Sequence, residues 1–498
     1  MLYFLLIIFT CLSFLIYLFL IWNFDHWQNR NVRAPRPYPL FGSFPNLLLR
    51  RQHFADDLCD IYKRYKITDN YVGTYLMRTP TLMVIEPQIV HDIFVTAFKH
   101  FDDNDVGKLI DTTKDPLIAK NPFILSGKEW QLQRSLISPA LTGSHIKQTY
   151  HAIALICQQM SKFIIKQGLC GINGKELALR FTAESLCSSI LSIEANSFTD
   201  RPLPISENVN KFASDNIAFT IFTLLVGLFP MILKVYQMKF FPKDCEKFFT
   251  DLIDRAYKLR CLEHCASNDI LDHLLKIKDL QNLSQMDLYS HTMTFLIDGL
   301  DTTATVISHC LLMLALEPTC QNTLFEEIQR SSENEAEISF NKLNEMPYLD
   351  ACIHESLRIY PPGLWATKCC SKSYQLKNKD GNILTLQKGD SIIIPIYALH
   401  HDSKYYPEPY KFKPERFLQE NGGVKHYRDH GVFLGFGDGP RTCLGMRFAL
   451  FQSKAAITSL IRRFHININP RTQREFKLDP KNFLALHNGG VWLDFEER

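Results

Sequence analysis

The segment from Phe436 to Gly445 contains the residue types best suited to chemistry, in the order Phe-Gly-Asp-Gly-Pro-Arg-Thr-Cys-Leu-Gly. Its glycines permit tight turns and close backbone approach, and its proline stiffens the loop. Cys443 comes just before a predicted helix, where free N–H groups and the helix dipole favour a thiolate. Such a thiolate is suited to be an axial metal ligand, and Arg441 is placed to meet an anionic group of the same ligand.

A second group of polar residues interrupts the clearest helix in the sequence. Ser284 offers an N-cap hydroxyl with Asp287 three residues later, apolar residues recur to about Leu316, and Pro318 ends the pattern. A helix of about 30 residues is about 45 Å long and, being apolar, should cross the centre of the protein. In its middle lies Asp298-Gly299-Leu300-Asp301-Thr302-Thr303. Glycine and unpaired carboxylates are costly in a core, so this segment is a candidate site.

The decapeptide resembles, at every fixed position, the haem-binding signature F-x-x-G-x-R-x-C-x-G of the cytochrome P450 family. This resemblance implies that Cys443 is the proximal thiolate ligand of the iron of haem b. It also implies that Phe436, Arg441 and Gly445 bind the haem. The resemblance runs from the N-terminus to Arg498, and the residues after the cysteine are most similar to microsomal, insect-type enzymes related to the drug-metabolising branch.

Two further motifs are similar to those of the same family. Glu355 and Arg358 resemble the E-x-x-R of its K helix, and residues three apart share a helix face and can pair. In the family the arginine of a P-E-R-F segment, here Arg416, completes this structural group, which is needed for haem incorporation. Trp130 and Arg134 resemble the W-x-x-x-R of the C helix, whose side chains reach a haem propionate.

The polar segment of the long helix resembles the family pattern [A/G]-G-x-[D/E]-T-[T/S]. The resemblance implies that Gly299 opens space above the iron, and that Asp301 and Thr302 supply protons for oxygen activation. Asp298 departs from the pattern, which has Ala or Gly there. It is either a protonated or hydrogen-bonded carboxylate facing a neighbouring helix, or it is ester-linked to the haem, as a Glu is in a fatty-acid-hydroxylating branch. Lys368 stands where relatives have a propionate-binding Arg, and it keeps the charge without the bidentate fork.

The stretch from Met1 to Phe24 contains no charged residue and supplies the roughly 20 apolar residues that a transmembrane helix needs. A cleaved signal peptide is the alternative, but it usually has a basic start and a small-residue cleavage site, and neither is present. We therefore expect a retained signal anchor. Arg30, Arg33 and Arg36 follow it, which by the positive-inside rule places the N-terminus in the lumen and the remaining chain in the cytosol.

The length of 498 residues suggests about three domains. The pattern beyond residue 50 is mostly helical without internal repeats, which favours one body instead. We expect an anchor over residues 1–24, a Pro-rich linker over 25–45 and a catalytic domain over 46–498. A second uncharged stretch, Asn216 to Leu233, predicts an apolar surface segment dipping into the same bilayer face, with a buried core helix as the alternative. A net charge of +3 and a hydrophobic content of 46% exclude nucleic-acid-binding and disordered classes.

The resemblance implies a mainly α-helical P450 fold with minor β-sheets, anchored in the endoplasmic reticulum. It implies a monooxygenase that inserts one atom of O2 into a lipophilic small molecule, with electrons from NADPH through NADPH–cytochrome P450 reductase and with cytochrome b5 as a further partner. Lys128, Arg447 and Lys454 are candidate docking residues. The alternatives are a haem-thiolate isomerase or dehydratase, which Asp301 and Thr302 disfavour, and a haem protein that binds lipophilic ligands without turnover.

Overall fold

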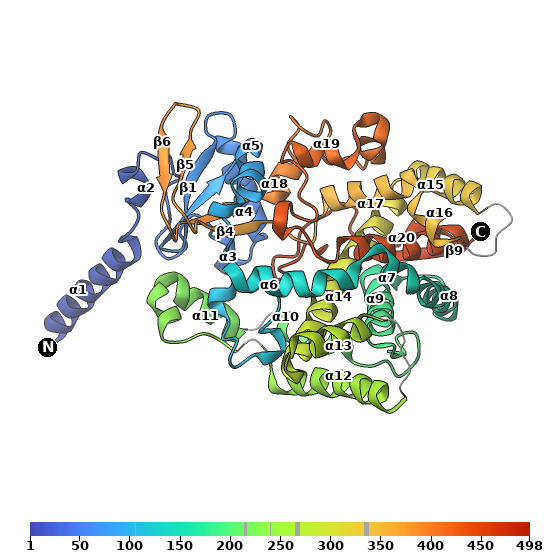
Figure 1. Cartoon of the computed structure of the whole chain (residues 1–498). Helices are drawn as coiled ribbons and strands as arrows, with labels where there is room; N and C mark the ends of the chain where they lie inside the picture. The colour runs from blue at the N-terminus through green and yellow to red at the C-terminus, as the bar shows by residue number, and fades with distance from the viewer. Residues whose placement is uncertain (105, 214–216, 240, 264–268, 333–337) are drawn as a thin grey trace.

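Helices dominate the architecture, and the strands form three small sheets (Figure 1). The computed structural model describes residues 1–104, 106–213, 217–239, 241–263, 269–332 and 338–498. The mainly α fold with minor β-sheets, preceded by one apolar N-terminal helix, is therefore confirmed.

The α-helices of the first half of the chain are α1 (Leu2–Ile21), α2 (His26–Asn29), α3 (Asn46–Leu49), α4 (Phe54–Tyr65), α5 (Pro87–His91), α6 (Gly127–Ile137), α7 (Gly143–Gln148), α8 (Tyr150–Lys166), α9 (Gly174–Leu191), α10 (Ile205–Ala213), α11 (Ile217–Leu228) and α12 (Lys243–Glu263). Those of the second half are α13 (Ile270–Gln281), α14 (Gln285–Leu316), α15 (Pro318–Ser331), α16 (Phe340–Asn344), α17 (Pro347–Ile359), α18 (Ile396–His400), α19 (Gly423–Asp429) and α20 (Met446–Arg463).

The largest sheet has the strand order β1-β2-β7-β4, in which only the β2–β7 pair is parallel. The second sheet has the order β3-β9-β8, and β5 and β6 form a separate antiparallel pair. The strands are β1 (Tyr71–Leu76), β2 (Thr79–Val84), β3 (Ile172–Asn173), β4 (Ala366–Cys369), β5 (Tyr374–Lys377), β6 (Ile383–Leu386), β7 (Ser391–Ile394), β8 (Phe464–Ile468) and β9 (Trp492–Glu497).

The long helix α14 crosses the centre of the body, as its apolar pattern predicts (Figure 1). The predicted capping box is present, because the Ser284 hydroxyl accepts the N–H of Asp287 while the Asp287 carboxylate accepts the N–H of Ser284, each at 3.0 Å. The helix ends at Leu316, two residues before Pro318. Two described helices, α1 and α14, are long and apolar enough to cross a membrane, but α14 is mostly buried in the body and is a core helix.

The N-terminal helix α1 buries none of its side chains and projects from the body beside α11 (Figure 1). Only its C-terminal end touches the body. The Phe19 ring stacks on Phe229 at 5.0 Å between centroids, and the Arg78 guanidinium lies 3.7 Å from the centre of the same Phe19 ring. Arg78 also donates to the carbonyl oxygen of Leu228 at 2.8 Å. The end of α1 is thus attached both to the β1–β2 turn and to the segment that follows α11.

The segment predicted as a linker packs on the body over part of its length. Trp27 is buried, its indole N–H donates to the carbonyl of Thr74 at 2.9 Å, and its ring lies where a side chain at Gly73 would stand. Arg30 pairs with Asp390 at 3.0 Å, beyond β6. The division into an anchor over 1–24, a linker over 25–45 and a catalytic domain from 46 stays a prediction.

The second uncharged stretch lies at the surface over its described part. Among its residues Ile221 is 50% exposed, Phe229 is 44% exposed and Met231 is 71% exposed. Its first residue, Asn216, lies outside the described residues. These exposures fit the prediction of an apolar surface segment and not the alternative of a buried core helix.

Candidate functional site

The loop from Phe436 to Gly445 folds back on itself and ends at the N-terminus of α20. The N–H of Cys443 donates to the carbonyl of Phe436 at 2.8 Å. Gly439 has a φ of +64°, and a Cβ there would lie 1.9 Å from the carbonyl oxygen of Phe94, so only glycine fits. Gly445 is the N-cap residue of α20. The sequence-predicted position of Cys443 just before a helix is therefore confirmed.

We infer an internal cavity at Cys443 from two properties of its side chain. It is exposed, yet burial raises the pKa of its thiol, which means that the sulfur borders a space enclosed by protein. A hydrogen bond from the backbone of Gly445 and the positive charge of Arg134 act in the opposite direction and lower this pKa. The negative charge of Asp298 raises it. The charges of Arg134 on α6 and of Asp298 on α14 are therefore close enough to the thiol to act on its pKa.

Two cationic side chains stand at the edge of this cavity. Arg134 on α6 donates to the carbonyl of Thr442 at 2.6 Å, and burial lowers the pKa of its guanidinium. Lys368 on β4 is buried, with its ammonium 4.8 Å from the centre of the Phe94 ring. Burial and the charge of Arg441 lower the Lys368 pKa to about 7. Among the described residues Lys368 forms no ion pair, so this buried amine fits an anionic group that enters from the cavity.

The Arg441 side chain is held in place by several hydrogen bonds to backbone carbonyls. Its guanidinium donates to three backbone carbonyls, those of Asp102 at 2.7 Å, Pro122 at 3.1 Å and Leu125 at 2.8 Å. It also lies 4.3 Å from the centre of the buried Trp130 ring, and burial lowers its pKa to about 10. Three of the five N–H donors of the guanidinium are thus used. The Asp103 carboxylate lies 4.0 Å from it, beyond hydrogen-bond distance, so two donors stay available to an anion.

Asp298 and Thr302 lie one helical turn apart on α14, beside the inferred cavity. Asp298 is exposed toward the cavity, and burial raises the pKa of its carboxyl to about 7. The Thr302 hydroxyl donates to the carbonyl of Asp298 at 2.6 Å. The expectation that Gly299 opens space on the same side is wrong, because a Cβ there would lie 3.1 Å from Leu186 on α9. The glycine lets α14 approach α9 instead.

Asp301 is not a free carboxylate, because Lys175 at the start of α9 reaches it. The Lys175 ammonium lies 2.6 Å from the Asp301 carboxylate and donates to the Asp301 carbonyl at 2.8 Å and to the Thr305 hydroxyl at 2.6 Å. Burial lowers the pKa of this amine, while Asp301 raises it. The ion pair fixes the α14 turn beside the cavity to α9.

Replacing Lys175 by methionine is expected to lower the free energy of unfolding by about 1–3 kcal/mol, since the Asp301 carboxylate loses its cation where it is only 20% exposed. The double variant Lys175→Met, Asp301→Leu should regain most of this loss, because two apolar side chains leave no unpaired charge. Urea-unfolding midpoints measure both effects. The control is Lys166→Met, which removes an exposed pair with Asp200 and should leave the midpoint unchanged. A double variant no more stable than Lys175→Met would refute this role of the pair.

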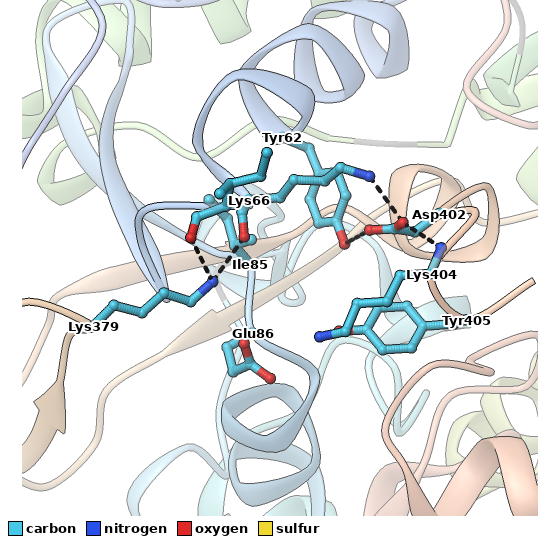
Figure 2. A pocket seen from close by; sticks show the side chains of 9 residues that line it. Tyr62, Lys66, Ile85, Glu86, Lys379, Asp402, Lys404 and Tyr405 are labelled. Atoms are coloured by element: carbon cyan, nitrogen blue, oxygen red, sulfur yellow. Dashed lines mark hydrogen bonds and ion pairs between the residues drawn. The ribbon is translucent and has the colours of Figure 1, made fainter.

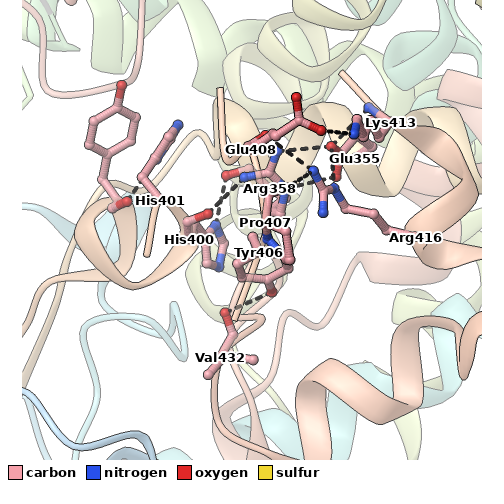
Figure 3. A network of polar contacts seen from close by, with 11 residues as sticks. Glu355, Arg358, His400, His401, Tyr406, Pro407, Glu408, Lys413, Arg416 and Val432 are labelled. Carbon is pink, nitrogen blue, oxygen red and sulfur yellow. Dashed lines mark hydrogen bonds and ion pairs between the residues drawn. The ribbon is translucent and has the colours of Figure 1, made fainter. Parts of the chain in front are cut away.

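Glu355 and Arg358 on α17 form the predicted pair, and both side chains are fully buried (Figure 3). Arg358 donates to the two carboxylate oxygens of Glu355 at 2.7 and 2.8 Å, and Arg416 reaches the same carboxylate at 3.3 Å. The group expected from the resemblance is therefore assembled in the structure. The N–H of Lys413 also donates to Glu355, at 3.0 Å.

His400 connects this group to the cysteine loop. Arg358 donates to the carbonyl of His400 at 2.7 Å, and the His400 ring meets the carbonyl of Arg358 at 3.0 Å (Figure 3). Its other ring nitrogen accepts the N–H of Leu434 at 2.9 Å, two residues before Phe436. Burial lowers the pKa of His400 well below its usual range, so the ring is neutral and one nitrogen is free to accept.

The three candidate docking residues differ in their exposure to solvent. Lys128 and Arg447 are exposed. Lys454 is buried and pairs with Asp350 at 2.7 Å, so its prediction as a surface docking residue is wrong. The reason is that α20 packs this face against α17 and not against solvent.

A surface pocket of about 320 Å³ lies elsewhere on the molecule (Figure 2). None of the sequence-predicted site residues lines it. Several of its polar side chains already have partners, since Lys66 and the Tyr62 hydroxyl both reach the Asp402 carboxylate at 2.8 Å. Lys379 donates to the carbonyl of Lys66 at 2.8 Å. This pocket therefore offers no group for the chemistry predicted around Cys443.

Sequence reasoning missed three residues that hold the site: Lys175, His400 and Asn121, which donates to Asp298. Each acts on a residue more than 40 positions away, so no local spacing reveals it. The signal that was available is weak. A lysine and an asparagine are ordinary surface residues by type, and only their burial here marks them.

Comparisons with known proteins show what the chain is similar to. The family model described as Cytochrome P450 matches residues 32–493. The chain is 44% identical over 486 residues to "Probable cytochrome P450 28c1" of Drosophila melanogaster. The aligned region covers 97% of this chain and 96% of that protein. It is 41% identical to "Probable cytochrome P450 28d1" of the same fly, over 97% of both chains. It is 31% identical to "Cytochrome P450 9e2" of Blattella germanica, over 97% of this chain and 96% of that protein.

Proposed function

Because the chain belongs to the cytochrome P450 family of haem monooxygenases, we propose that it is a membrane-anchored enzyme that inserts one atom of O2 into a lipophilic small molecule. The observation that carries this proposal is the Cys443 thiol, which borders an internal cavity at the N-terminus of α20. A backbone N–H group and a helix N-terminus stabilise a thiolate at this place.

The residues around the cavity fit haem b. Cys443 would ligate the haem iron through its thiolate, and the haem would supply the oxygen-activating chemistry. Lys368, Arg134 and the two remaining donors of Arg441 would meet its propionates. The Trp130 ring stacks on the Arg441 guanidinium and supports it. Phe436 and Gly445 shape the loop on the thiolate side, through the Phe436 carbonyl and the Gly445 N–H.

Asp301 and Thr302 are the residues that we assign to proton delivery. The Lys175 ammonium fixes the Asp301 carboxylate next to the cavity wall. The Thr302 hydroxyl donates a hydrogen bond to the carbonyl of Asp298, so the lone pairs of its oxygen stay available to accept a hydrogen bond from a water that carries the proton.

The proposal also names an electron donor and a cellular location for the protein. NADPH–cytochrome P450 reductase is the proposed electron donor, with cytochrome b5 as a further partner, and the exposed Lys128 and Arg447 are docking candidates. The apolar helix α1 anchors the protein in the endoplasmic reticulum membrane. Arg30, Arg33 and Arg36 favour a lumenal N-terminus and a cytosolic catalytic domain.

The test uses the purified full-length protein loaded with haem. Its reduced carbon-monoxide complex should show the red-shifted Soret band of a thiolate ligand, and lipophilic compounds that shift the iron to high spin should stimulate NADPH consumption with reductase. A product formed without NADPH would favour the isomerase or dehydratase alternative. A thiolate band with ligand-induced spin shifts but no NADPH consumption would favour a ligand-binding protein.

A further inference from the structure

Two carboxylates lie three residues apart on the cavity side of α14, and only one of them has a cation. Asp301 pairs with Lys175 at 2.6 Å. Asp298 forms no ion pair within the described part of the chain. Its side-chain partner is the amide of Asn121, which donates to both carboxylate oxygens at 3.3 Å.

Asn121 is a fixed partner and a weak one. It is buried, and its side-chain oxygen accepts the N–H of Phe123 at 2.7 Å, which turns the amide nitrogen toward Asp298. Both contacts to Asp298 are at the long end of hydrogen-bond distances. A carboxylate offers about four lone-pair directions, so most of its accepting capacity stays open toward the cavity.

The Asp298 side chain is accessible although it lies inside the body, which is the combination expected of a group that borders the inferred cavity. Asp298 is exposed although burial raises its pKa to about 7, and its charge acts on the Cys443 thiol across the cavity. Interior carboxylates are normally paired, because an isolated charge is costly at low dielectric constant. A cation that enters the cavity supplies the missing partner, and its approach favours the ionised form of Asp298.

We propose that Asp298 is a specificity-determining residue that selects lipophilic substrates carrying a protonated amine, an inference that rests on the proposed function. The ammonium donates a charge-assisted hydrogen bond to the free lone pairs of Asp298, and the apolar part of the molecule fills the cavity. Asn121 positions the carboxylate by donating to both of its oxygens.

The experiment compares two probes of nearly identical shape on the full-length, haem-loaded protein. The probes are N,N-dimethyl-4-phenylbutylamine and its neutral carbon isostere, (5-methylhexyl)benzene, and equilibrium dialysis measures their dissociation constants. The wild type should bind the amine about 10- to 100-fold more tightly than the isostere. Asp298→Asn should remove this preference while the isostere binds unchanged, and Asp298→Glu should keep it. Asp200→Asn removes one exposed carboxylate on the surface and should leave the preference intact.

Equal affinity of the two probes for the wild type would overturn the proposal. So would an undiminished preference in Asp298→Asn, which would also arise if the amine nitrogen simply bound the iron. Haem content and the carbon-monoxide spectrum of each variant show that it is folded. A wild type that lacks the thiolate band has failed the proposed function itself, whereas a normal band without amine preference overturns only the role of Asp298.

Discussion

Replacing Glu355 by alanine is expected to cost about 3–5 kcal/mol, out of the 5–15 kcal/mol by which a typical protein is stable. Glu355 and Arg358 are both fully buried, so the variant leaves the Arg358 guanidinium without its counter-charge in the core. Arg416 and the N–H of Lys413 lose the same acceptor. We therefore expect little folded protein, and little haem bound per chain.

The measurement is haem content per chain together with the urea-unfolding midpoint. Glu408→Ala is the matched control, because Glu408 lies next to the same group but its exposed carboxylate pairs only with Lys411 and Lys413. This control should unfold like the wild type and load a normal amount of haem. A Glu355→Ala chain with wild-type midpoint and haem content would contradict the structural role of the group.

Replacing Cys443 by alanine is expected to lower monooxygenase activity by more than about 100-fold, because loss of partners one step removed from a metal already costs about 10–100-fold. The folded body should survive, since the thiol borders a cavity and supports no packing. The red-shifted band of the carbon-monoxide complex should disappear, because no thiolate remains on the iron.

Cys170→Ala is the control for this variant, because Cys170 is also exposed but does not border the cavity loop. It should keep both the band and the activity. A Cys443→Ala protein that retained the band would show that another cysteine ligates the iron, and the assignment of Cys443 would then be wrong.

The sequence was sufficient where the determining residues are neighbours. Ser284 and Asp287 cap α14 as their spacing predicts, and Cys443 stands before α20 because its loop contains the glycines that the turn requires. The apolar helix at the N-terminus followed from composition alone. In each case the interaction is formed within a few residues.

The rest depends on contacts between distant segments. The direction in which Gly299 faces is set by how α14 packs on α9, which no local pattern encodes. Lys454 was expected at the surface by its type, but Asp350 on α17 holds it in the core. The pairing of Asp301 with Lys175 similarly needs two helices that are 126 positions apart. Tertiary packing decided all three.

The short connection after α1 has a mechanical consequence. The helix ends at Ile21, and Trp27 is already locked into the first sheet, so the intervening residues span at most about 20 Å and leave no slack tether. The stack of Phe19 on Phe229 and the hydrogen bond from Arg78 to Leu228 also hold the end of α1 against the end of α11. With α1 in a bilayer, as we propose, a change in its tilt that a thinner or thicker bilayer imposes would be transmitted to α11 and would change the orientation of the whole body.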